Sequence, residues 1–487
     1  MYEPGKSDDP VLPAKPPNKA VAAEVVEERG SAKGNTDSAA RSGRSAGQGV
    51  SPGLDRVREA ALKDRKARFT ALLHHVDLDR LRAAYRAVNP AAAAGVDGVT
   101  WAAYGEELEG NLQNLLTRVH CGSYRAQPSR RAYIPKTDGR QRPLGIASLE
   151  DKIVQRAVVE VLNAIYETDF LGFSYGCRPG RNPHDALDAL ATGILRKKVN
   201  WVLDADLRDF FTSLDHGWLL RFLEHRIGDT RVLRLIQKWL RAGVIEQGSW
   251  SESPEGVPQG ASVSPLLANV YLHYVLDQWA QQWRKRHARG DMIVVRYLDD
   301  FVAGFEHQGD AEQFLVDLRE RLARFALELH TQKTRLIEFG RFAAKDRAAR
   351  GLGKPETFDF LGFTHICGKT RAGQFKLQRI TMSKRMRAKL HQVKYRLQRS
   401  RHLPIPVQGR WLRSVVRGHF AYYAVPGNGR ALGSFRYHVG RHWHRALRRR
   451  SQRHRLTWDR MNRLIATWLP PTRISHPYPD VRFAART

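Results

Sequence analysis

The stretch VVRYLDDFVAGF, residues 294–305, places two adjacent carboxylates, Asp299 and Asp300, between two apolar runs. Burial of a carboxylate is costly unless a cation or hydrogen bonds compensate its charge. A third carboxylate, Asp206, ends the apolar run WVLDAD further upstream. Two strands that each end in Asp can pair in one sheet and hold two divalent cations, as phosphoryl-transfer enzymes require. Taken alone, the pattern also suits a helix N-cap and a solvated turn, so its surroundings must decide.

The amino-acid composition indicates a polyanionic partner. The chain has 487 residues, with 81 Lys and Arg against 49 Asp and Glu, which gives a net charge of +32. Aromatic residues are also plentiful, so we expect nucleic acid, and a basic protein that merely adheres to acidic surfaces is the alternative. Residues 371–487 alone have 28 Lys and Arg against Asp459 and Asp480, a net charge of +26. Basic charge interleaved with aromatic residues suits phosphate neutralisation and base stacking, although a solvated basic helical bundle has the same composition.

Cysteine usage and hydropathy bear on the cellular compartment. Only Cys121, Cys177 and Cys367 occur, far apart and without a CxxC pair, which argues against a disulfide framework or a zinc ribbon. The sequence has no uninterrupted apolar run of about 18 residues, and its first residues lack the apolar core of a signal peptide. We therefore expect a cytoplasmic protein that works away from membranes.

Composition and periodicity divide the chain into segments. Residues 1–55 are rich in Ala, Gly, Ser, Pro and charge, so we expect a disordered leader. From 56 to 370, helical and strand patterns follow one another, which indicates a mixed α/β domain. The elements that matter most are a hairpin over 130–146 with a turn at Thr137-Asp138-Gly139, a strand over 201–206, strands on both sides of the Asp pair, and a long helix over 264–283.

Several ordered blocks resemble a bacterial group II intron-encoded reverse transcriptase and maturase, from about Leu62 to about Trp468. These blocks are YIPKTDGRQRPLGI (133–146), SYGCRPGRNPHDAL (174–187), DADLRDFF (204–211), PQGASVSPLLANVYL (258–272), YLDD (297–300) and FDFLGF (358–363). The resemblance implies an α+β right-hand polymerase with fingers and palm over 56–370. It also implies an α-helical thumb or maturase domain (domain X) over 371–440 and a basic nucleic-acid-binding tail over 441–487.

The resemblance also assigns catalytic and nucleotide-binding residues. Asp206, Asp299 and Asp300 would be the catalytic carboxylates that ligate Mg²⁺, as two ions, with Mn²⁺ as a substitute. The residues expected around the incoming nucleotide are Lys136, Arg142, Phe211, Gln259, Gly260 and Lys333. Phe211 would exclude a 2′-hydroxyl and so favour deoxynucleotides, with a core Phe as the alternative. For Lys136, Arg142 and Lys333 the alternative is an ordinary surface cation.

Two further sets of residues are expected to contact the primer or the RNA. Tyr297 and Leu298 would lie at the primer terminus, and Leu298 stands where most group II enzymes have Ala. Thr212 stands where the family usually has Asp, which removes a supporting carboxylate but no metal ligand. In the C-terminal region, the residues expected to bind RNA are Arg417, Tyr422, Tyr423, Arg445, Arg448 and Arg449.

The sequence therefore predicts an RNA-directed DNA polymerase of the group II intron type that binds intron RNA and promotes splicing and mobility. Its expected partners are intron RNA or another RNA template, a DNA primer or target, and deoxynucleoside triphosphates, in a bacterial, nucleoid-associated setting. The sequence lacks the Cys pairs and His pattern of a metal-dependent nuclease finger, so we expect no endonuclease domain. The alternatives are a host-adopted reverse transcriptase in DNA repair or phage defence, which the Leu at 298 favours, and a maturase or RNA chaperone whose polymerase is unused.

Overall fold

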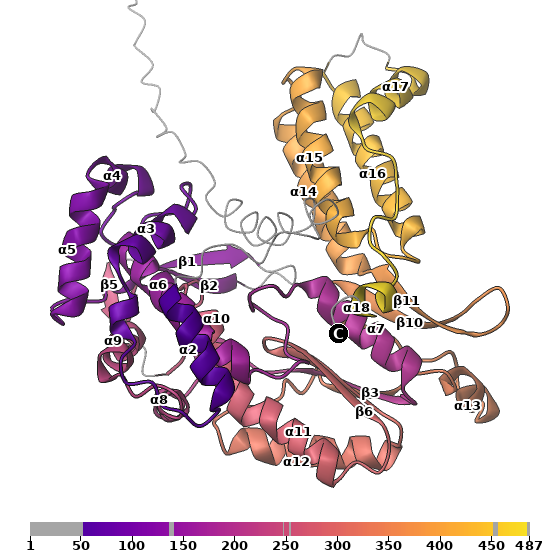
Figure 1. The fold of residues 1–487 in the computed structure, drawn as a ribbon. Coiled ribbons are helices and arrows are strands. Elements are labelled where there is room, and N and C mark those ends of the chain that lie inside the picture. Colours follow the sequence, from indigo (N-terminus) through magenta and orange to yellow (C-terminus); the bar gives the residue numbers. More distant parts are fainter. Residues whose placement is uncertain (1–51, 136–140, 247, 253–254, 451–455, 485–487) are drawn as a thin grey trace, which may run out of the picture.

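The computed structural model describes residues 52–135, 141–246, 248–252, 255–450 and 456–484 (Figure 1). Residues 1–51 of the predicted leader lie outside this part of the chain. The prediction that the leader extends to residue 55 is wrong, because helix α2 (Pro52–Lys63) begins at Pro52. Proline is favoured in the first turn of a helix. Leu54, in the first turn, is buried in the main core and anchors the helix there.

The N-terminal part combines helices with a small sheet. Helix α6 (Leu149–Asp169) crosses its core and begins after Ser148, whose hydroxyl accepts a hydrogen bond from the Asp151 N–H. The two strands of the predicted hairpin are confirmed, with Ile134 opposite Arg142 in antiparallel register, and they belong to a sheet of order β2-β1-β4-β5. The predicted turn at 137–139 lies outside the described residues. The other elements are η1 (Leu73–His75), α3 (Leu78–Ala87), α4 (Trp101–Glu106), α5 (Leu108–His120), β1 (Ser129–Pro135), β2 (Gln141–Ile146), β4 (Val244–Glu246) and β5 (Ser249–Ser251).

A second sheet, the palm sheet, is antiparallel throughout and has the strand order β6-β7-β3-β8. Its strands alternate between two apolar layers: Leu203 packs in the core that contains Phe314 of α12, and Val202 packs in the core that contains Leu187 of α7. Helices therefore cover both faces (Figure 1). The bounds are β3 (Trp201–Asp206), β6 (Met292–Tyr297), β7 (Asp300–Phe305), β8 (Arg335–Glu338), α7 (Pro183–Arg196), η2 (Phe210–Thr212), α8 (His216–Glu224), α9 (Thr230–Arg241), α12 (Gln308–Ala323) and α13 (Ala343–Ala349).

The long helix predicted over 264–283 contains an irregularity. It consists of α10 (Ser264–Leu272), a π-helical turn η3 (His273–Asp277) and α11 (Gln278–Arg286). A π-helical turn adds one residue to a helical turn and often lies near a functional site. Here it places Asp277 in the protein interior, beneath the palm sheet.

The C-terminal part is a helical bundle, called the thumb bundle, joined to the palm by a small sheet of order β11-β10-β9. The predicted boundaries at 370/371 and 440/441 are wrong. The first falls between two paired strands, and the second falls inside α16, because Trp443, Leu447 and Met461 complete the core of the bundle. The bounds are β9 (Phe358–Phe360), β10 (Phe363–Lys369), β11 (Phe375–Thr381), α14 (Ser383–Arg399), α15 (Ile405–Tyr423), α16 (Gly429–Arg448) and α17 (Trp458–Trp468).

The chain then returns to the palm. Helix α18 (Pro479–Ala484) packs against α7, so the two ends of the thumb bundle are both attached to the palm (Figure 1). A mixed α/β part followed by a helical part confirms the predicted α+β class. Within the described residues, every helix is too short or too polar to cross a membrane.

Candidate active site

The palm sheet brings the three predicted carboxylates together. Strands β3 and β7 are antiparallel, and Asp206 lies directly opposite Asp300 in their register. Strands β6 and β7 form a hairpin whose two-residue turn is Leu298 and Asp299. Leu298 has a φ of +56°, as the first position of the turns that suit a two-residue hairpin requires. Residues far apart in the sequence therefore present their carboxylates at one end of the sheet.

The electrostatics of this end of the sheet disfavour isolated negative charge. Burial raises the pKa of the Asp300 carboxyl well above its ordinary value, and Asp204, Asp299 and Asp206 raise it further. Burial also raises the pKa of Asp204 to about 6, although Arg335, at 3.5 Å from it, acts in the opposite direction. Sequence reasoning missed Asp204. The signal was present, because residues two apart in a strand share a face, and Asp204 precedes Asp206 by two.

The cluster has the donor chemistry of a divalent cation site. Carboxylate oxygens are the ligands that Mg²⁺ prefers, and it often binds one or two carboxylates together with substrate phosphates. Among the described residues, no three Asp, Glu, His or Cys side chains form a ready-made metal site. The ammonium of Lys333 forms an ion pair with Asp206 Oδ2, so a cation already neutralises this carboxylate. Asp206, Asp299 and Asp300 therefore offer oxygen ligands that would hold a divalent metal once a substrate supplies further ones.

Several predicted nucleotide-binding residues lie around the loop that contains Gln259. The Gly145 N–H of β2 donates to the Gln259 carbonyl at 2.7 Å. Gly260 has a φ of +104°, and a Cβ there would lie 2.9 Å from the Gly145 carbonyl oxygen, so glycine is required. The same loop reaches the other side of the site, where the Val257 N–H donates to the Phe211 carbonyl at 2.7 Å. The loop thus links the fingers hairpin to Phe211.

The remaining predicted residues are only partly described. Phe211 is half-buried against the main core, whereas its neighbour Phe210 is fully inside it, and the role of Phe211 beside the sugar stays a prediction. Arg142 lies on strand β2, and Lys136 lies outside the described residues. Burial raises the pKa of Tyr297 to about 12, and its backbone pairs with that of Asp300.

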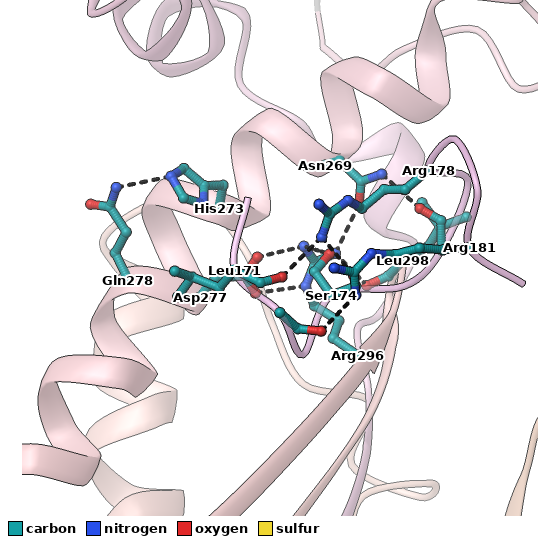
Figure 2. A network of polar contacts seen from close by, with 12 residues as sticks. Leu171, Ser174, Arg178, Arg181, Asn269, His273, Asp277, Gln278, Arg296 and Leu298 are labelled. Carbon is teal, nitrogen blue, oxygen red and sulfur yellow. Dashed lines mark hydrogen bonds and ion pairs between the residues drawn. The ribbon is translucent and has the colours of Figure 1, made fainter. Parts of the chain in front are cut away.

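A buried network supports the turn that carries Asp299 (Figure 2). Arg296 is completely buried and forms two hydrogen bonds to Asp277, at 2.7 and 2.6 Å. It also donates to Asn269 Oδ1 at 3.1 Å, to Ser174 Oγ at 2.7 Å and to the Leu298 carbonyl at 3.1 Å. All its donor nitrogens are therefore used. Sequence reasoning missed Arg296, although an Arg inside the apolar run VVRYL is a signal for a buried partner.

Leu298 itself lies against the loop that contains Gly176. A Cβ at Gly176 would lie 2.5 Å from the Leu298 backbone nitrogen and 2.8 Å from its Cγ, so only glycine fits there. Asn269 holds the same loop by donating to the Gly176 carbonyl at 2.8 Å. The position of Leu298 beside a primer terminus stays a prediction.

The residues predicted to bind RNA divide into two groups. Tyr422 and Tyr423 pack in the joint between palm and thumb, where Tyr422 donates to the Leu361 carbonyl at 2.7 Å and stacks on Phe363. Both tyrosines are half-buried in this joint, so only part of each ring is open to solvent, and their contact with RNA stays a prediction. Exposed side chains make up the second group, which consists of Arg417, Arg445, Arg448 and Arg449.

Comparison with known proteins identifies this arrangement. Residues 134–365 match the family described as reverse transcriptase (RNA-dependent DNA polymerase). They contain the palm sheet and all three carboxylates, so this part of the chain is a reverse transcriptase domain.

Similar proteins indicate which kind of reverse transcriptase this domain resembles. Group II intron-encoded protein LtrA of Lactococcus lactis subsp. cremoris is 32% identical over 247 residues, which are 48% of this chain and 41% of LtrA. Protein YkfC of Escherichia coli (strain K12) is 37% identical over 238 residues, 43% of this chain and 62% of YkfC. An uncharacterized 91 kDa protein in the cob intron of Schizosaccharomyces pombe is 38% identical over 170 residues, 35% of this chain and 21% of that protein. The domain is therefore similar to reverse transcriptases encoded by group II introns, and the chain spans less than two thirds of each of these relatives.

Proposed function

We propose that the protein is an RNA-directed DNA polymerase of the group II intron type, which also binds intron RNA to promote splicing and mobility. The observation that carries the proposal is the register of the palm sheet. Asp206 and Asp300 lie opposite each other, and Asp299 occupies the turn beside them, inside a reverse transcriptase domain. This is the carboxylate arrangement that a nucleotidyl transfer needs.

Each part of the site has a role in this reaction. Asp206, Asp299 and Asp300 hold Mg²⁺, as two ions, and Mn²⁺ can replace it. When bound, the ions lower the pKa of the primer hydroxyl and neutralise the charge of the triphosphate. Lys136 and Arg142 bind the triphosphate, since Arg can bind phosphate bidentately. The half-buried Phe211 excludes a 2′-hydroxyl by its shape, and Gln259 and Gly260 support the base pair that forms.

The thumb bundle binds RNA in this proposal. The segment 371–487 has a net charge of +26, and Arg417, Arg445, Arg448 and Arg449 are exposed on it. Phosphate neutralisation by such side chains releases counterions and dominates affinity for nucleic acid. The partners are intron RNA or another RNA template, a DNA primer or target, and deoxynucleoside triphosphates.

The test is primer extension on an RNA template. We expect Asp206→Asn and Asp299→Asn to lower the extension rate at least a hundredfold, because each removes a charge from the metal site. RNA affinity should change little, since it depends on the thumb bundle. Asp79→Asn is the control, because its side chain is 90% exposed on α3 and should leave both activities unchanged.

Two outcomes favour the alternatives. If the wild type does not extend primers but accelerates splicing of an intron RNA, the polymerase is unused and the protein is a maturase. If it extends primers and neither binds nor splices intron RNA, a host function in repair or defence gains support.

A further inference from the structure

The outer side of the thumb bundle has a pocket that no role above uses. It lies between α16 and α17, has a volume of about 670 Å³ and is lined by Arg436, Tyr437 and Arg441 of α16 and by Trp458 and Asn462 of α17. Small-molecule sites commonly have about 300–1,000 Å³. The pocket is therefore large enough for one nucleotide.

Two aromatic rings in this pocket remain open to solvent. Tyr437 is 59% exposed and Trp458 is 45% exposed. Protein contacts hold each ring on one side: the Arg441 guanidinium lies over the Tyr437 ring, 5.7 Å from its centroid, and the centroids of the His444 and Trp458 rings lie 4.2 Å apart. Large aromatic surface that is both exposed and held in place is suited to stacking on a ligand.

The charge of the pocket selects the ligand. Arg436 and Arg441 line it, and among the residues that the structure describes no carboxylate does. Arg436 donates to the Pro470 carbonyl at 3.0 Å, which fixes this wall. Asn462 adds an amide that can both donate to and accept from the edge of a base. Aromatic rings, guanidinium groups and an amide together match a nucleobase with its phosphate better than an apolar peptide.

We propose that this pocket binds one unpaired nucleobase of the RNA held by the thumb bundle. The base stacks on Tyr437 and Trp458, Asn462 contacts its edge, and Arg441 faces the adjoining phosphate. The base must be unpaired, because bases inside an RNA duplex are already stacked and paired. This inference rests on the RNA binding in the proposed function and assigns it a specific, single-stranded contact.

The experiment compares the double variant Tyr437→Ala/Trp458→Ala with the wild type by fluorescence anisotropy. The probes are a single-stranded RNA oligonucleotide and a fully paired RNA duplex, each over a series of salt concentrations. Loss of stacking is worth about 1–3 kcal/mol per base, so affinity for the single strand should fall about tenfold. Affinity for the duplex should stay the same, and so should the log–log salt slope, because no phosphate contact is removed.

Matched variants make the result specific. Tyr437→Phe keeps the ring and should retain wild-type affinity. Tyr395→Ala removes an equally exposed ring, which pairs with Arg399 at 5.6 Å on α14 but lies outside the pocket, and should have no effect. Equal losses on single strand and duplex, an equal loss in Tyr395→Ala, or unchanged affinity in the double variant would overturn the proposal.

A parallel primer-extension assay separates this inference from the proposed function. At a saturating concentration of primed template, where weaker RNA binding no longer limits the rate, the double variant should extend a primer at the wild-type rate, which also shows that it is folded. Absence of extension in the wild type would count against the polymerase alone. Wild-type extension combined with unchanged single-strand affinity of the double variant would count against the pocket alone.

Discussion

At the scale of single residues, the turn between β6 and β7 is held in an unfavourable backbone conformation. Leu298 adopts the left-handed region, which costs a residue with a Cβ about 1–2 kcal/mol. The Leu298 carbonyl accepts a hydrogen bond from Arg296, and the close approach to Gly176 leaves the turn little freedom. The carboxylates of Asp299 and Asp300 therefore depend on a guanidinium that never reaches the substrate, and Arg296 is a positioning residue.

We expect Arg296→Lys to impair both stability and catalysis. Lys has three donors where Arg has five, and hydrogen bonds to charged groups are worth about 1.5–3 kcal/mol each. The free energy of unfolding should fall by about 3 kcal/mol, and kcat of extension should fall at least tenfold with little change in KM for nucleotide. The control is Arg226→Lys, because Arg226 is also buried and pairs with Asp169 at 3.0 Å. It should lose similar stability and keep its kcat, whereas an unchanged kcat in Arg296→Lys would make the network purely structural.

At the scale of elements, the contact between α7 and α18 joins the palm to the end of the described chain. Asp188 of α7 pairs with Arg379 at 2.7 Å and with Arg482 of α18 at 3.1 Å. Beside this group, the rings of His184 and His476 stack at 4.1 Å. Burial lowers the pKa of His184 to about 3, and the nearby His476 adds to the effect. His184 is therefore neutral here at physiological pH, and its Nε2 lies 2.7 Å from the Tyr422 carbonyl.

The burial of a neutral His184 predicts that the folded protein loses stability in acid. In the unfolded chain His184 has a pKa of about 6.5. Between pH 6.5 and about 3, the unfolded state therefore binds more protons, and stability falls as the pH falls. We expect Tm of the wild type to drop between pH 7 and pH 5, and to drop less in His184→Gln, whose amide still donates but does not titrate. The comparison isolates His184 because other buried histidines, among them His365 and His419, are common to both proteins. Parallel Tm curves would contradict the assignment.

At the scale of the whole molecule, charge is separated between the two parts. The segment 371–487 carries +26 of the total +32, so the polymerase part is close to neutral and the C-terminal part holds most of the excess charge. Figure 1 shows the thumb bundle extending away from the palm sheet. The electrostatic part of RNA affinity should therefore come mainly from the thumb bundle.

We expect the triple variant Arg445→Gln/Arg448→Gln/Arg449→Gln to flatten the salt dependence of RNA binding. Each lost phosphate contact lowers the log–log slope by about 0.7 to 0.9, so the three together should lower it by about 2 to 3. Affinity should fall equally for single-stranded and duplex RNA, which differs from the effect expected for the aromatic pocket. The control replaces three exposed arginines outside the thumb bundle with Gln, namely Arg58, Arg234 and Arg319. Equal effects of the two triple variants would place the phosphate contacts over the whole surface.

Local sequence patterns were sufficient for the fold class and for the centre of the site. The apolar runs that end at Asp206 and surround Asp299 predicted the strands of the palm sheet, because strand burial has a period of two and turns have their own residue preferences. The hairpin over 130–146 followed from the same rules. The resemblance to group II reverse transcriptases, based on ordered blocks, is confirmed by the reverse transcriptase match over 134–365 together with the similarity to LtrA.

Other features depended on contacts between distant segments. In the sequence, Arg296 is one more residue of an apolar strand. The structure shows that Asp277, Asn269 and Ser174 accept hydrogen bonds from it. Tyr422 lies in a basic segment rich in aromatic residues, which predicted an RNA-binding ring. Only the tertiary structure shows that this ring packs against Phe363 in the joint between palm and thumb.

By itself, then, the sequence determined the fold class, the palm strands and the three carboxylates, because periodicity and turn chemistry are properties of neighbouring residues. The tertiary structure alone decided the partners of buried charges, the extent of the thumb bundle and the faces of its aromatic rings that stay exposed. Burial of a side chain is set by all the segments that pack around it, and those segments are not adjacent in sequence.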